Sequence, residues 1–117
     1  MMGIITDLEV VLKNLGYRPN TTAQELMKDE YDVLIRIVDS PMEVESVASY
    51  RVRFNIDITF LCFDSINYYN LVKSIIENVY TNLNDVKFKW IDIKPEIENQ
   101  TYLVHFIAEY QEVINVG

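Results

Sequence analysis

The stretch YRVRFNIDITFLC, residues 50–62, alternates between apolar and polar side chains along most of its length. The apolar positions are Tyr50, Val52, Phe54, Ile56, Ile58, Phe60 and Cys62, and the positions between them begin with Arg51, Arg53, Asn55, Asp57 and Thr59. Successive side chains of a strand point to opposite faces of a sheet, so the pattern predicts a long β-strand with one buried and one wet face. A helical pattern follows almost at once, opening at Asp64 or Ser65.

Amphipathic helices are predicted on both sides of this strand. The first has a capping-box spacing at Thr6-Asp7-Leu8-Glu9, and Gly16 is well placed to end it in a left-handed conformation. The second is expected over residues 66–81, where the apolar stripe is Tyr69, Val72, Ile75 (or Ile76), Val79 and Leu83. A second capping-box spacing, at residues 22–25, predicts a short helix over residues 23–28.

Three further strands are predicted. Residues 31–38 read as a strand, and the polar, Pro41-containing segment 39–48 connects it to the long strand, so the two are expected to form a long hairpin with an acidic tip. Another strand begins at Val86, and its apolar parity slips between Trp90 and Ile91, which indicates a bulge or a strand buried on both faces. Residues 94–100 are expected to be a loop, and residues 101–113 the last strand.

These elements predict one α+β domain that spans residues 1–117. Helix, hairpin, helix and hairpin follow one another in the order α-β-β-α-β-β. Antiparallel strands with helices segregated to one side form a two-layer fold, so we expect a sheet of about four antiparallel strands with two main helices packed on one face. A chain of 117 residues is close to the commonest domain size.

Composition narrows the classes of function. The net charge is −8, which argues against a protein that grips nucleic-acid phosphates. The single cysteine, Cys62, excludes an intramolecular disulfide and indicates a buried thiol in a reducing compartment. No signal peptide and no membrane span of about 20 apolar residues is visible, so we expect a protein that is cytosolic when made.

The charge is distributed unevenly along the chain. Residues 25–45 hold seven acidic residues against Lys28 and Arg36, whereas residues 86–94 hold three lysines against Asp92. A solvated surface explains this pattern. The alternative is a subunit with an acidic edge and a basic edge, which could join head to tail into a ring.

No residues are predicted to act in catalysis, to bind a cofactor or to hold a metal, and the chain is expected not to be an enzyme. His105 is the only histidine, which leaves a catalytic triad or a two-histidine metal site out of reach. His105 and Glu109 share a strand face, but four residues along a strand separate them by about 13 Å, too far for a shared metal.

The order of elements resembles the tail terminator, or tail completion, proteins of long-tailed bacteriophages and the related minor capsid and head–tail joining proteins. Three features carry this likeness. They are an opening amphipathic helix at Thr6–Leu12, a long strand at residues 50–60 that leads through a short joint into helix 66–81, and a closing pair of strands. The resemblance implies an α+β subunit without enzymatic activity or cofactor. It also implies a homo-oligomeric ring, often a hexamer, that caps the tail tube and docks it to the head.

The same resemblance implies a virion protein that is assembled in the host bacterial cytoplasm, with other phage tail and head-connector proteins as partners. DNA would pass through such a ring without being tightly bound, and no membrane would be involved. The expected subunit interface is the polar face of the long strand, at Arg51, Arg53 and Asp57, together with the acidic tip at Glu43 and Glu45. The alternative is a small soluble dimeric binding or regulatory domain that pairs through the edge of its sheet.

Overall fold

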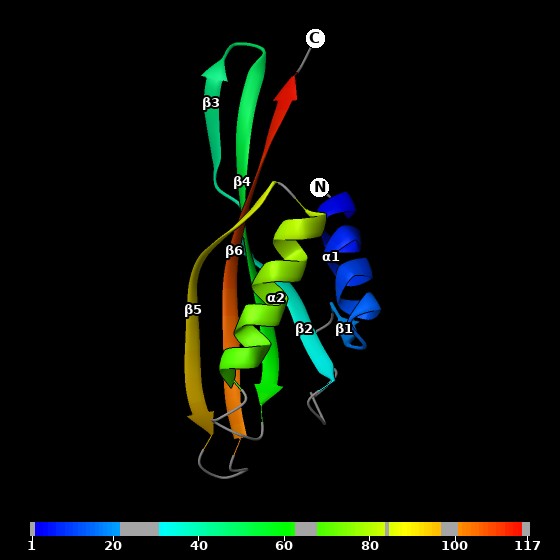
Figure 1. The fold of residues 1–117 in the computed structure, drawn as a ribbon. Coiled ribbons are helices and arrows are strands. Elements are labelled where there is room, and N and C mark those ends of the chain that lie inside the picture. Colours follow the sequence, from blue (N-terminus) through cyan, green and yellow to red (C-terminus); the bar gives the residue numbers. More distant parts are fainter. Residues whose placement is uncertain (1, 22–30, 63–67, 84, 97–100, 116–117) are drawn as a thin grey trace.

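The long strand predicted from the alternation, β4 (Ser49–Cys62), is the central strand of a six-stranded sheet (Figure 1). The computed structural model describes residues 2–21, 31–62, 68–83, 85–96 and 101–115. The other elements are α1 (Met2–Asn14), β1 (Arg18–Asn20), β2 (Asp32–Asp39), β3 (Met42–Ser46), α2 (Tyr68–Asn82), β5 (Val86–Glu96) and β6 (Thr101–Asn115). The α+β class is confirmed.

The strand count and order differ from the prediction. The sheet runs β1-β2-β4-β6-β5, and β3 pairs with β4 beyond the end of β2. Neighbouring strands are antiparallel except for β1, which pairs in parallel with β2 within a segment that we expected to be a loop. The two extra strands, β1 and β3, are short, and neither has the long alternation that marks β4.

The expected hairpin exists, but its polar connection is largely a strand. β2 pairs with residues 55–60 of β4, and β3 pairs with residues 49–52. Pro41 lies between β2 and β3, where its missing N–H interrupts the ladder. Its carbonyl still accepts a 3.0 Å hydrogen bond from the Arg53 backbone N–H, which keeps both halves aligned on β4. Glu43 and Glu45 lie on β3, and the turn itself is Val47-Ala48.

Both helices pack on one face of the sheet, which we call the core face (Figure 1). The helices contribute Leu8 and Leu12 from α1 and Ile75 and Val79 from α2, all fully buried. The strands contribute alternate residues, and all the predicted inward positions of β4 from Val52 to Cys62 are buried. Phe60 and Phe106 meet edge to face at the centre, with ring centroids 5.3 Å apart. The opposite face of the sheet is called the open face below.

The prediction that Tyr69 belongs to the buried stripe of α2 is wrong, because its side chain is 64% exposed. Six residues separate Tyr69 from the fully buried Ile75, which corresponds to a rotation of about 120° around a helix with 3.6 residues per turn. Tyr69 therefore points away from the sheet.

The second half of the chain corrects one boundary and confirms one irregularity. The register of β5 on β6 shifts between Phe88 and Trp90, so the parity slip does mark a bulge. β5 then continues to Glu96, through Lys94 and Pro95, which we expected in a loop. Pro95 is tolerated because β5 is an edge strand and needs ladder hydrogen bonds on one side only.

The first helix begins earlier than predicted and ends as predicted. α1 starts at Met2, so Thr6 lies within the helix and the capping-box interpretation is wrong. Gly16 has φ = 94°, and the backbone N–H groups of Gly16 and Tyr17 donate to the carbonyls of Lys13 and Leu12 at 3.0 Å. These two bonds form a Schellman motif. The predicted helix 23–28 and the opening of the second helix at residues 64–65 lie outside the described residues.

Replacing Gly16 with alanine should destabilise the fold by about 1 kcal/mol, because a Cβ is strained in the left-handed conformation. Gly3 is the matched control: it lies inside α1, and a Cβ added there meets nothing within 4 Å. Gly3→Ala should be neutral or stabilising, by up to about 1 kcal/mol. Urea unfolding followed by circular dichroism measures both, and equal effects at the two glycines would contradict the assigned cap.

Candidate functional site

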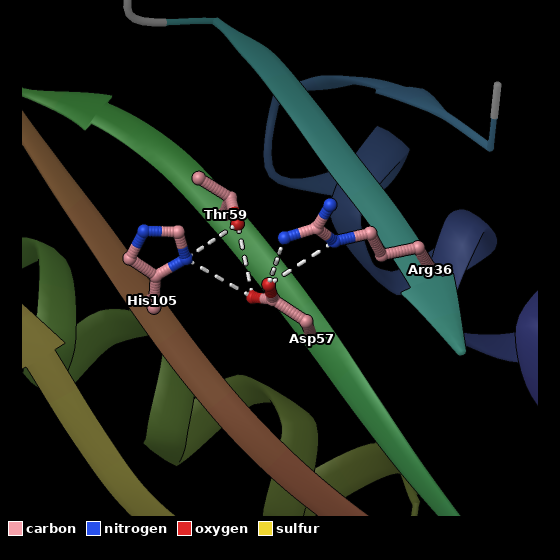
Figure 2. A network of polar contacts seen from close by, with 4 residues as sticks. All are labelled: Arg36, Asp57, Thr59 and His105. Atoms are coloured by element: carbon pink, nitrogen blue, oxygen red, sulfur yellow. Dashed lines mark hydrogen bonds and ion pairs between the residues drawn. The ribbon is translucent and has the colours of Figure 1, made fainter. Parts of the chain in front are cut away.

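A cluster of polar side chains ties three strands together on the open face (Figure 2). Arg36 comes from β2, Asp57 and Thr59 from β4, and His105 from β6. Arg36 donates from Nη2 and Nε to Asp57 Oδ2, at 3.0 and 3.3 Å. Thr59 Oγ1 donates to Asp57 Oδ1 at 2.9 Å and lies 2.8 Å from His105 Nδ1. Asp57 therefore gathers partners from both neighbouring strands.

Hydrogen-bond direction within this cluster identifies its role. Thr59 Oγ1 donates its single proton to Asp57, and in the tautomer that carries a proton on Nδ1, His105 donates to Thr59 Oγ1 and to Asp57 Oδ1, which lies 3.3 Å away. A catalytic hydroxyl requires the reverse arrangement, in which it gives its proton to the imidazole. With this tautomer the cluster is a structural clamp that links β2, β4 and β6 in one register.

Asp57 is the one predicted interface residue that lies in this cluster. Its side chain is only 5% exposed, although it projects from the face that was expected to be wet. Arg36 and His105 are 21 and 48 residues away in the chain, so no local pattern pairs them with Asp57. The sheet register brings them together, because Arg36 is the direct cross-strand partner of Asp57.

Beyond the helices, three strands project as an arm (Figure 1). We define the arm as β3, residues 49–52 of β4 and residues 111–115 of β6, in which β4 lies in the middle and pairs with both other strands. Large apolar side chains are exposed along it: Met42 by 61%, Val44 by 67% and the turn residue Val47 fully. Val113 and Ile114 are also exposed, on the third strand of the arm.

The other four predicted interface residues lie on the open face of the arm or next to it. Arg51 pairs with Glu45 and donates to Gln111 Oε1 at 3.0 Å, and Glu43 lies opposite Arg51 in the register. Arg53 pairs with Glu109 at 3.0 Å. These ion pairs form within one chain, so they account for the charged residues on this face without a neighbouring subunit. A role of these residues in an interface stays a prediction.

Met42, Val44 and Ile114 share the core-face side of the arm and were not predicted as contact residues. Val44 and Ile114 flank Tyr50 in the register, one on each side. The alternation Met42-Glu43-Val44-Glu45 is the sequence signal for this strand, but it is only four residues long and directly follows Ser40-Pro41. The structure therefore adds an apolar surface to the polar one that the sequence suggested.

A hollow of about 500 Å³ lies at the base of the arm on the core-face side, between the helix ends and β6. Asp7, Asp85 and Glu112 line it together with Tyr110. Burial raises the pKa of the Tyr110 hydroxyl above 10.0, and the charges of Glu112, Asp85 and Asp7 raise it further. Within the described part of the chain, no three His, Cys, Asp or Glu side chains are arranged to hold a metal ion.

Because its pKa is raised on folding, the neutral Tyr110 hydroxyl contributes stability below pH 10 that is lost as the pH rises through the folded-state pKa. Tyr110→Phe keeps the ring that stacks on Phe54 and removes this ionisation. Urea unfolding at pH 8 and near pH 11 should therefore show a smaller loss of stability for the variant than for the parent chain. Equal losses would show that Tyr110 does not ionise at different pH in the folded and unfolded states.

Removing the carboxylate at the centre of the cluster should destabilise the fold. Asp57→Ala leaves Arg36, Thr59 and His105 without their shared acceptor, which should cost about 1–3 kcal/mol. Asp39 is the control, because its exposed carboxylate accepts one hydrogen bond from Asn55. Asp39→Ala should change the free energy of unfolding by less than about 0.5 kcal/mol. Similar values for the two variants in urea unfolding would contradict the clamp.

No model of a known protein family matches this chain, and a search of curated proteins finds no match. No helix among the described residues has the length and apolarity needed to cross a membrane.

Proposed function

We propose that this chain is a non-enzymatic structural protein of a long-tailed bacteriophage virion, a ring-forming tail terminator or head–tail joining subunit. In this role, several copies, six in the commonest arrangement, cap the tail tube and provide the surface that docks it to the head. The ring assembles in the host cytoplasm, and its partners are tail and head-connector proteins. DNA passes through it without tight binding.

The arm is the observation that carries this proposal. Soluble monomers rarely leave large apolar side chains grouped on a projecting segment, and such groups mark surfaces that another protein covers. Here Met42, Val44 and Val47 are exposed on a subunit whose dimensions are 52 × 28 × 22 Å. An elongated subunit with an apolar projection is suited to contact neighbours in an assembly.

Charge supports the same role. The net charge of −8 repels DNA, so an acidic ring lets the genome pass without holding its phosphates. Arg51 in the arm and Arg53 next to it have carboxylate partners in Glu45 and Glu109, which reduces their attraction for phosphate. The second candidate function, a dimeric binding domain, draws on the same arm but predicts two copies and no tail-tube partner.

Assembly distinguishes the two functions. The purified chain is measured by light scattering and by negative-stain electron microscopy, alone and with the major tail-tube protein encoded in the same genome. The proposal predicts rings that sit on tube ends and limit tube length. A stable dimer that leaves tube growth unchanged would refute it and favour the dimeric domain.

A pair of valine variants tests the contribution of the arm. Val44→Glu places a charge on the apolar side of the arm and should weaken ring formation or tube capping at least tenfold. Val10→Glu adds the same charge at a half-exposed position of α1, away from the arm, and should assemble normally. Equal assembly of the two variants would show that the arm is not part of the interface.

A further inference from the structure

Among the described residues, the edges of the sheet are not equally protected. β1 covers the outer side of β2 over Asp32–Leu34. The rest of β2, Ile35–Asp39, has a strand on one side only, and its register on β4 shifts between Ile37 and Asp39, an irregularity that blunts an edge. β5 lines the opposite side of the sheet, where its lysines, its bulge and Pro95 are features that natural proteins use to block strand addition. In addition, the Tyr80 hydroxyl accepts a 2.9 Å hydrogen bond from the Phe88 backbone N–H, which caps that edge from α2.

The two edges of the arm lack lysine, although the register of β3 on β4 shifts between Val44 and Ser46. β3 pairs with β4 on one side only, and β5 starts opposite Tyr110, so residues 111–115 of β6 also have a strand on one side only. Both edges are free of proline. Each is five residues long, and they flank the same residues of β4: Met42 and Glu112 flank Val52, whereas Val44 and Ile114 flank Tyr50.

We propose that the arm is the self-association surface of this protein, in which β3 of one copy pairs with residues 111–115 of β6 in the next copy. β3 and β6 are both antiparallel to β4, so they run parallel to each other. A copy rotated about an axis along the strands therefore presents β3 in parallel to the neighbour's β6 at the same level. Such a contact is heterologous and can close into a ring without an axial step.

The positions of the carboxylates favour this pairing over the alternative between two β3 strands. Glu43 and Glu45 lie on the open face, where Glu45 pairs with Arg51. The only carboxylate of residues 111–115 is Glu112, which lies on the core-face side and lines the acidic hollow. When β3 of one copy pairs with residues 111–115 of the next, no two carboxylates of these segments therefore lie opposite each other on the same face, in any register. Antiparallel pairing of two β3 strands about a twofold axis brings Glu43 and Glu45 of both copies together, which is unfavourable.

The apolar side chains match across the same boundary. Met42 and Val44 of one copy continue the core-face side of the neighbour's arm next to Ile114, so residues that each copy exposes alone become covered. The ring symmetry of this pairing rests on the proposed function. The choice of the two edges rests on the strand pairing and the charges of the arm.

Cysteine cross-linking tests the pairing in a Cys62→Ala background. Val44→Cys and Ile114→Cys are made as separate chains and mixed before oxidation. Within one chain the two positions are separated by an intervening strand, about 10 Å, so they cannot form an internal disulfide. The pairing predicts a mixed dimer from the two chains, little product from either chain alone, and a ladder of multimers from the chain that carries both cysteines.

A Val44→Cys dimer as the main product would show pairing between two β3 strands and overturn the inference. Absence of the mixed cross-link would also overturn it, whether the chain is assembled or monomeric. Electron microscopy of the same samples separates the two claims, because rings that form without the mixed cross-link leave the proposed function standing and remove only this edge pairing.

A charge variant provides an independent test. Val113→Glu puts a carboxylate on the open face of the β6 edge, next to Glu43 and Glu45 of the neighbouring copy, and should weaken association about fivefold per contact. The additional substitution Glu43→Lys should restore it. The matched control is Val10→Glu, which should associate like the parent chain. Unchanged association of Val113→Glu would contradict the pairing.

Discussion

The length of β4 is the constraint on which the rest of the structure depends. Its 14 residues extend about 46 Å, whereas the 13 and 15 residues of α1 and α2 span only about 20–22 Å. Two helices lying along the sheet are therefore too short to cover the whole strand. The inward residues from Val52 to Cys62 are buried, whereas the start of β4 continues into the arm, which keeps its strand pairing but receives no helix. The exposed apolar residues of the arm follow from this mismatch.

The two faces of the sheet are stabilised by different means. The core face is sealed by apolar packing between the helices and alternate residues of β2, β4 and β6. The open face uses cross-strand polar contacts, with the Asp57 cluster in the body and the Arg51–Glu45 and Arg53–Glu109 ion pairs toward the arm. These contacts hold the strands in one register without a covering layer. Edge pairing between copies would need such a fixed register, because a strand that slips by one residue turns its side chains to the other face.

The sequence predicted what depends on local periodicity and missed what depends on register. The alternation at residues 50–62 identified the buried face of β4, Gly16 identified the end of α1, and the parity slip at Trp90 identified the bulge in β5. Asp57 looked like a wet-face residue because Arg36 and His105 reach it only through the sheet. β3 was read as a connection because four alternating residues beside a proline are a weak signal on their own. Tyr69 was misplaced because its helical spacing to Val72 fits an apolar stripe, whereas the buried face of α2 is centred on Ile75 and Val79.

Hydrogen exchange of the assembled protein is the most direct test of the central claim, that the arm edges are where copies meet. Exchange is compared between dilute, dissociated chains and the assembled state. The account predicts that amides of β3 and of residues 111–115 become protected on assembly, whereas the outer edge of β5 exchanges equally in both states. Protection along β5 with an unchanged arm would contradict it.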